Sequence, residues 1–184
     1  MHNKSLKQYC FINKLNISQL SQINNDVGII FRNYNNGKKL ETIKKLKQYC
    51  KKYGKKLFLS NDIKLAIRLN LNGVYIPAFN KNIIHKSYLL KKDFEILGSA
   101  HNINEINLKK RQGVTILFIA PVFKFKKKIL GIYGFLKLKE FSKSKCIALG
   151  GITKKNFKLL KLIKADGFAG IEYFTKKKAP FKGP

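Results

Sequence analysis

The sequence predicts a single compact α/β domain, a (β/α)8 TIM barrel, over its 184 residues. Short apolar runs alternate with segments whose apolar residues recur every three or four positions, a pattern typical of strands followed by helices. The apolar runs are nearly continuous, as buried parallel strands are. About eight such alternations in one domain favour a closed barrel. A doubly wound open sheet is the alternative.

Eight apolar runs are predicted to be strands. In chain order they cover residues 9–13, 27–32, 57–60, 73–76, 95–98, 115–120, 146–149 and 167–173. Helical periodicity predicts helices between them, one through Leu40, Ile43 and Leu46 and another through Phe157 and Leu160. No linker divides residues 1–184. The basic tail 175–184 contains prolines, so the last helix is predicted to be short or missing.

The composition is that of a folded intracellular protein. Hydrophobic residues make up 45% of the chain, and no apolar run approaches the ~20 residues that span a bilayer. The first residues lack the apolar centre of a signal peptide. Cys10, Cys50 and Cys146 are widely spaced and odd in number, which favours buried free thiols over disulfides. We therefore predict a cytoplasmic protein without membrane contact.

The chain is strongly basic, with 39 Lys and Arg against 9 Asp and Glu and a net charge of +30. Only three of these basic residues are arginines: Arg32, Arg68 and Arg111. Proteins that read nucleic-acid sequence favour arginine, because its planar guanidinium forms bidentate bonds with bases and phosphates. Lysines are spread over nearly every predicted helix. This distribution indicates solvated basic faces and no specific nucleic-acid partner. A nucleic-acid footprint is the alternative, and salt-sensitive adhesion to polyanions is expected in either case.

The most informative segment is the run Cys-Ile-Ala-Leu-Gly-Gly-Ile-Thr at residues 146–153. A buried strand here leads directly into Gly150 and Gly151. Paired glycines let the backbone approach a ligand closely, because no Cβ stands in the way. In barrels, phosphates and substrates bind at this carboxyl end of the strands. The segment therefore predicts a binding site for a phosphorylated small molecule.

Other polar residues follow the remaining strands and would meet at the same rim. They are Arg32, Asn61, Asp62, Asn80, Ser99, His101, the lysine-rich run 124–128 and Glu172. Each type of residue also has a structural interpretation. Asp62 suits the N-cap of the next helix, His101 suits an exposed loop, and the lysine run suits a solvated loop. Convergence at one rim favours a site.

These motifs together resemble the thiamine-phosphate synthase/TenI superfamily, whose members are compact (β/α)8 barrels. The resemblance runs from about residue 9 to residue 173 and is most specific in two segments, Ala-Leu-Gly-Gly-Ile at 148–152 and Pro-Val-Phe at 121–123. Arg32, the Asn61-Asp62 pair, Gly-Val at 73–74 and Gly-Ser-Ala-His at 98–101 follow the family's order.

The resemblance implies that a pyrimidine pyrophosphate is coupled to a thiazole phosphate with loss of pyrophosphate. It also assigns roles to residues. Asp62 would bind Mg²⁺, Asn61 and Arg32 would contact the pyrophosphate, and Lys128 would be a catalytic cation. Ser99 would lie near the reacting pyrimidine. The amides of Gly150 and Gly151 would hold the thiazole phosphate.

Two alternatives stay open within the superfamily. TenI-type tautomerases move a proton on a thiazole carboxylate phosphate, and the resemblance would make His101 their acid and base. A non-catalytic barrel would bind a phosphorylated ligand, or a partner, through its basic rim. Self-association is also left open.

Several positions depart from the synthase pattern. Ile30 and Tyr34 replace a glutamine and a lysine near the second strand, and Asn80 replaces the second carboxylate of the Mg²⁺ site. An amide in place of a carboxylate weakens a site for a hard cation. Glu172 replaces a small hydroxyl residue and would repel a phosphate. The departures therefore argue against Mg²⁺-dependent synthase chemistry.

Overall fold

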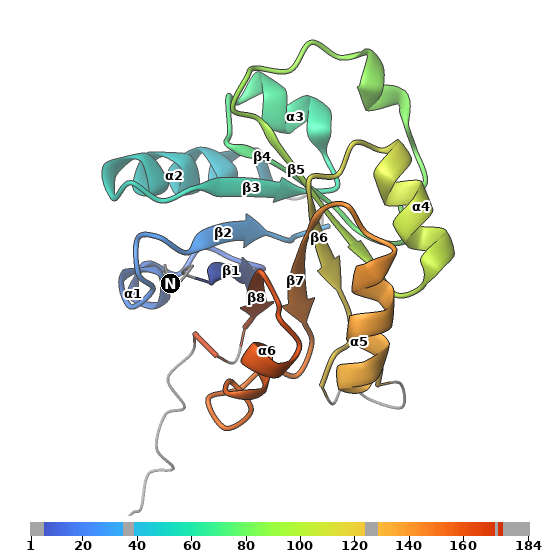
Figure 1. The fold of residues 1–184 in the computed structure, drawn as a ribbon. Helices are drawn as coiled ribbons and strands as arrows, with labels where there is room; N and C mark the ends of the chain where they lie inside the picture. Colours follow the sequence, from blue (N-terminus) through green and yellow to red (C-terminus); the bar gives the residue numbers. More distant parts are fainter. Residues whose placement is uncertain (1–5, 35–38, 124–128, 172, 175–184) are drawn as a thin grey trace, which may run out of the picture.

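The computed structural model describes residues 6–34, 39–123, 129–171 and 173–174. Eight parallel strands form a closed barrel in sequential order, with helices around the outside (Figure 1). The barrel closes where Lys7 of the first strand pairs with Gly167 of the last. This closure confirms the predicted (β/α)8 fold and excludes the doubly wound alternative.

All eight predicted strands are present. They are β1 (Lys7–Ile12), β2 (Gly28–Phe31), β3 (Leu57–Ser60), β4 (Gly73–Ile76), β5 (Glu95–Ala100), β6 (Ile116–Ile119), β7 (Lys145–Leu149) and β8 (Gly167–Gly170). The prediction ended the fifth strand two residues too early. Ser99 and Ala100 continue β5 because they pair with Phe118 and Ile119 of β6. The prediction also carried the eighth strand past Gly170, where β8 ends.

Helical segments follow most of the strands. They are α1 (Ile17–Ser21), α2 (Lys39–Lys52), α3 (Ile63–Arg68), the 3₁₀ helix η1 (Ile84–Ser87), α4 (Ile103–Arg111), α5 (Gly131–Glu140) and α6 (Leu159–Leu162). The predicted helix around Leu160 is therefore a single turn. The connection between β4 and β5 carries η1 in place of an α-helix. The predicted short or missing last helix falls in 175–184, outside the described residues.

The core has two parts. Side chains from all eight strands fill the barrel interior, where the rings of Phe11, Tyr75 and Phe118 meet edge to face at 5.1–6.1 Å between centroids. A second cluster lies between the sheet and the helices and includes Ile43 and Leu46 of α2. Because the interior is packed, a ligand site belongs at the rim of the barrel and not inside it.

The three cysteines are free and buried, as predicted. Burial raises the pKa of Cys10 to about 12 and that of Cys50 to about 11. Such thiols stay protonated and unreactive at neutral pH. None of the helices in the described residues is long and apolar enough to cross a membrane.

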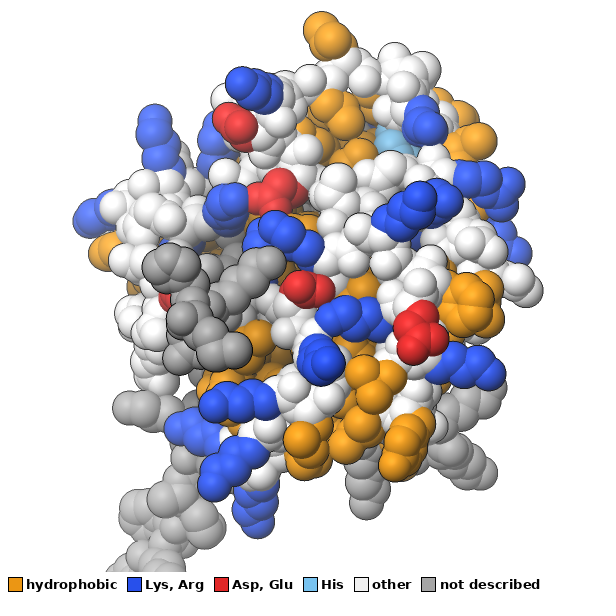
Figure 2. All heavy atoms as spheres, in the orientation of Figure 1, with side chains coloured by type: hydrophobic (Ala, Val, Ile, Leu, Met, Phe, Trp, Pro, Cys, Tyr) orange, Lys and Arg blue, Asp and Glu red, His pale blue; other side chains and the backbone are white. Residues whose placement is uncertain are grey.

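Basic side chains are scattered over the face of the molecule in Figure 2, with acidic and apolar side chains between them. On this face they do not gather into one stripe. The distribution on this face matches the spread of lysines along the sequence.

Candidate functional site

A cavity of about 720 Å³ opens at the carboxyl ends of the strands. Residues at or just beyond the ends of β1, β2 and β4 to β8 line it. Five residues predicted from the sequence lie in its wall: Arg32, Ser99, His101, Gly150 and Gly151. Asn61 and Asp62 instead line a smaller neighbouring pocket of about 230 Å³. Lys128 and Glu172 lie outside the described residues.

The glycine pair after β7 forms one wall of the cavity. Gly150 and Gly151 have φ angles of 97° and 68°, a region that side chains disfavour. A Cβ on Gly150 would lie 2.9 Å from the Cα of Pro121, so this position also lacks space for a side chain. Among the described residues, none accepts a hydrogen bond from either glycine amide. Both donors are therefore available to an anion in the cavity.

Asn156 fixes the loop that follows these glycines. Its Nδ2 donates to the carbonyl oxygen of Gly151 at 2.8 Å, and its Oδ1 accepts from the amide of Thr153 at 2.8 Å. These two bonds hold the carbonyl side of the loop. Asn156 was not predicted as a site residue, because an asparagine in a polar segment is common.

Arg32 supplies a cation directly after β2. Its backbone amide donates to the carbonyl oxygen of Ile12 at 2.8 Å, and this bond fixes the Arg32 backbone at the end of the barrel. Its half-buried guanidinium lies 5.1 Å from the centroid of the Phe11 ring. This cation–π contact holds the charge over the aromatic floor of the cavity.

Two aromatic residues stand at the mouth of the cavity. Tyr34 and Phe79 meet edge to face with 6.0 Å between centroids, and both are exposed. The Tyr34 hydroxyl forms a hydrogen bond of 3.1 Å with Ser60 Oγ. The tyrosine that replaces the family's lysine therefore adds an aromatic face to the rim.

Ser99 lies deep in the cavity, where it is 4% exposed. Burial raises the pKa of Tyr75 to about 12, although a polar interaction with the nearby Ser99 side chain and the charge of Arg32 oppose the rise. The tyrosine therefore stays neutral, and the pair offers hydroxyl groups and no charge. Sequence reasoning missed Tyr75 as a site residue because it also belongs to an apolar strand.

His101 lies at the cavity edge and is held by Glu105. The ring Nδ1 is 2.9 Å from Glu105 Oε2, which also accepts a 2.7 Å bond from the His101 amide. Burial alone would raise the pKa of Glu105, but the bonds from His101 outweigh it and lower the pKa. The ionised carboxylate therefore accepts a hydrogen bond from Nδ1–H, which leaves Nε2 for acid–base chemistry. Glu105 was not predicted from the sequence, although its position four residues after His101 could have indicated this pair.

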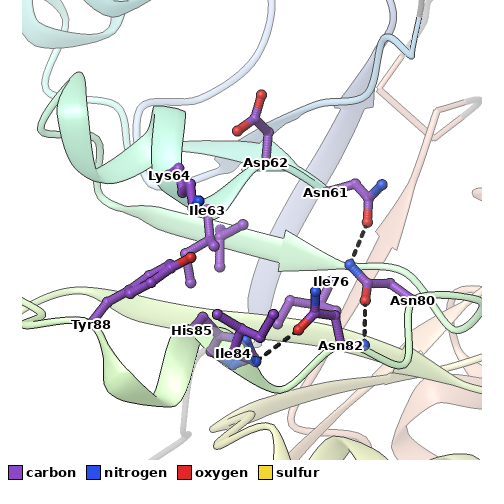
Figure 3. Close-up of a pocket in the computed structure, with 11 residues that line it drawn as sticks. Asn61, Asp62, Ile63, Lys64, Ile76, Asn80, Asn82, Ile84, His85 and Tyr88 are labelled. Carbon is purple, nitrogen blue, oxygen red and sulfur yellow. Dashed lines mark hydrogen bonds between the residues drawn. The ribbon is translucent and has the colours of Figure 1, made fainter.

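The smaller pocket lies beside β3 and β4 (Figure 3). Asn80 Nδ2 donates to Asn61 Oδ1 at 2.7 Å, and Asn80 Oδ1 accepts from the amide of Asn82 at 2.8 Å. Asp62 caps α3 by accepting from the amide of Leu65 at 3.1 Å. Its carboxylate points away from the two asparagines. The helix-capping interpretation of Asp62 is thus confirmed.

These residues do not fit a Mg²⁺ site in this arrangement. Mg²⁺ requires nearly octahedral oxygen ligands and usually binds through one or two carboxylates together with waters and substrate phosphates. Here Asp62 is the pocket's carboxylate, and it points away from Asn61 and Asn80. Within the described residues, no cluster of three His, Cys, Asp or Glu could hold a metal. We derive no chemical step through a metal.

Comparison with known proteins agrees with the resemblance seen in the sequence. A family model described as thiamine monophosphate synthase matches residues 19–174. A thiamine-phosphate synthase of Bacillus mycoides is 29% identical over 141 residues, covering 73% of this chain and 64% of its own length. One from Helicobacter pylori is 32% identical over 136 residues, covering 70% and 61%. The matched region thus spans less than two thirds of these relatives.

Solved structures support the fold. A thiamine phosphate pyrophosphorylase from Pyrococcus furiosus superposes with a TM-score of 0.75 and 20% identity, covering 93% of this chain and 91% of its own. A second one, from Bacteroides thetaiotaomicron, gives a TM-score of 0.63 and 14% identity, covering 97% and 89%. At these identities the structures show a shared barrel. The family model matches most of the chain, and the chain therefore belongs to the thiamine monophosphate synthase family.

Proposed function

We propose that this protein acts in thiamine biosynthesis by coupling hydroxymethylpyrimidine pyrophosphate to a thiazole phosphate. The observation that carries the proposal is the convergence of Arg32 and the Gly150-Gly151 pair on one cavity at the barrel rim. The cavity pairs a cation with backbone amides, so it offers two places for anions. Two anionic substrates that must meet in one site need such an arrangement.

In the proposed reaction, the C–O bond to the pyrophosphate breaks and the thiazole nitrogen forms a C–N bond to the same carbon. The leaving group takes up negative charge, which Arg32 in the wall of the cavity can offset. The amides of Gly150 and Gly151 would hold the thiazole phosphate. The neutral Ser99–Tyr75 pair would offer hydroxyl groups to the pyrimidine ring without adding charge.

Mixing the protein with both substrates and measuring pyrophosphate tests the proposal. We expect release only when both substrates are present, because the nucleophile is the second substrate. The reaction is run with and without Mg²⁺, since the family resemblance implies a metal at Asp62 and the structure gives that residue a capping bond. Folded protein that releases no pyrophosphate above background under either condition would contradict the proposal.

A specific contact favours a second candidate, a thiazole tautomerase. The bond between His101 Nδ1 and Glu105 orients the ring and leaves Nε2 for proton transfer. Conversion of the thiazole carboxylate phosphate between its tautomers, followed by NMR, tests this candidate. His101→Gln should abolish tautomerisation and leave pyrophosphate release intact if the synthase assignment is right. Binding of the thiazole phosphate without either activity would indicate the non-catalytic barrel.

We also propose a cytoplasmic location. The three free, buried thiols support a reducing compartment.

A further inference from the structure

A buried polar cluster on α4 holds the connection between β4 and β5. This connection contributes Phe79 to the mouth of the large cavity and Asn80 to the smaller pocket. In place of an α-helix it contains η1, so it lacks the regular backbone bonds that fix the other long connections. Something else must hold it, and the contacts come from Lys109 and Gln112.

Lys109 is 1% exposed, which is rare for a lysine. Its ammonium donates to the carbonyl oxygens of Pro77 at 2.8 Å and Asn80 at 3.0 Å. A third bond reaches Gln112 Oε1 at 2.8 Å. An ammonium has three N–H donors, and all three are used here.

Gln112 is fully buried and completes the cluster. Its Nε2 donates to the carbonyl oxygens of Asn80 at 3.0 Å and Asn82 at 2.8 Å. Its backbone carbonyl accepts a 2.8 Å bond from His85 Nε2 on η1. Four carbonyl bonds from two side chains therefore fix the connection between Pro77 and Asn82.

Gly98 on β5 makes room for this cluster. A Cβ at Gly98 would lie 3.1 Å from Cδ of Lys109 and 2.7 Å from Val114 Cγ2. The lysine stem thus passes over a glycine on its way to the loop. Strand β5, helix α4 and the 77–82 loop therefore all pack against the buried Lys109 side chain.

We infer that Lys109 and Gln112 are positioning residues that set the 77–82 loop, and with it Phe79 and Asn80, at the two pockets of the rim. The position of the 77–82 loop therefore depends on the positive charge of the Lys109 ammonium. This inference goes beyond the proposed function and does not depend on it.

The charge state of Lys109 can change near neutral pH. Burial lowers the pKa of Lys109 to about 8, and the charge of Glu105 opposes the shift. The titratable groups that face the cluster are Glu105 on α4 and His85 on η1, while β5 presents Gly98. A neutral amine has two N–H donors for the three acceptors. Deprotonation therefore breaks one bond and loosens the loop.

The chain contains no tryptophan, so Phe79→Trp places a single fluorescent reporter on the loop. Its emission is measured from pH 6.5 to 9 with circular dichroism as the check on folding. We expect one transition with a midpoint near the lowered pKa of Lys109, about 8. Emission that stays constant while the protein stays folded would overturn the inference, and this result needs no substitution of Lys109.

A second pair of variants assigns the transition. In the reporter protein, Lys109→Met keeps the stem and removes the ammonium, and it should abolish the transition. Lys110→Met changes the exposed neighbour on α4 and should leave it unchanged. Hydrogen exchange should show protection of residues 78–88 falling about tenfold or more with Lys109→Met, since bonds to a charged donor are lost. An unchanged transition or unchanged protection with Lys109→Met contradicts the inference. Neither readout requires turnover, so both are independent of the pyrophosphate assay.

Discussion

The large cavity and the smaller pocket are neighbours on one rim, but they are built in different ways. The wall of the cavity contains the glycine pair after β7 and an arginine held over an aromatic floor. In the pocket, Asn61 and Asn80 bond each other and Asp62 caps α3. The wall of the large cavity depends on backbone shape, which the two glycines preserve. The smaller pocket depends on polar side chains, and there the side chains bond one another or cap a helix.

The largest effect should come from the glycines. Gly150→Ala adds a Cβ 2.9 Å from Pro121 at a φ of 97°. We expect it to lower the free energy of unfolding by about 3 kcal/mol, through backbone strain and overpacking together, and to abolish thiazole phosphate binding. Gly54→Ala is the control for positive φ, because Gly54 has a φ of 64° but nothing within 4 Å of an added Cβ. Chemical denaturation and calorimetry measure both, and equal losses in the two variants would contradict the account.

Arg32 should have the next largest effect. Arg32→Met keeps the apolar stem and removes the cation that faces the cavity. We expect the pyrimidine pyrophosphate to bind about 10- to 100-fold more weakly, because a bond to a charged group is lost. Arg68→Met removes an exposed arginine at the end of α3 and serves as the control. If the Arg32→Met protein and the unsubstituted protein bind the pyrimidine pyrophosphate equally tightly, Arg32 does not contact this ligand.

Substitutions of Asp62 distinguish a helix-capping role from a metal-binding role. Asp62→Ala should lower the free energy of unfolding by about 1 kcal/mol, because α3 loses its N-cap. Asp62→Ser keeps a cap oxygen, so its stability should match that of the unsubstituted protein within a few tenths of a kcal/mol. If Asp62→Ser retains stability but loses pyrophosphate release, the carboxylate has the metal role that the family resemblance implies.

The smallest effect should come from Glu105 at low pH. Burial alone would raise the pKa of Glu105, but its bonds with His101 together outweigh that effect, and the pKa is lowered in the folded protein. Its contribution is therefore complete above the ordinary pKa of Glu and is lost as pH falls through the lowered folded value. Urea denaturation between pH 3 and 6 should show a shallower decline for Glu105→Gln. If the free energy of unfolding has the same pH dependence in both proteins, the bonds between Glu105 and His101 do not contribute to stability.

The barrel and part of the site could be predicted because their signals are local. Apolar runs predicted every strand, and Gly150 and Gly151 come directly after one of these runs in the sequence. Parallel strands bring their carboxyl ends together, so Arg32, Ser99 and His101 meet as expected. The position of Ser99 inside β5 was missed, because small residues at a strand end resemble a loop.

Contacts between distant segments could not be predicted. Lys109 looks like one of many lysines in the sequence, and only burial beneath the 77–82 loop distinguishes it. Asn61 was expected to contact a ligand, yet its oxygen accepts a bond from Asn80, 19 residues away. Such pairings depend on how the connection without an α-helix folds back. Residue types alone do not determine that path.

The central claim is that one cavity brings the two substrates together. The most direct test measures pyrophosphate and thiamine phosphate in the same reaction, with each substrate omitted in turn. The account predicts equal amounts of both products when both substrates are present and neither product when one is omitted. Pyrophosphate without thiamine phosphate would indicate hydrolysis. That result, or the absence of both products from folded protein, would contradict the account.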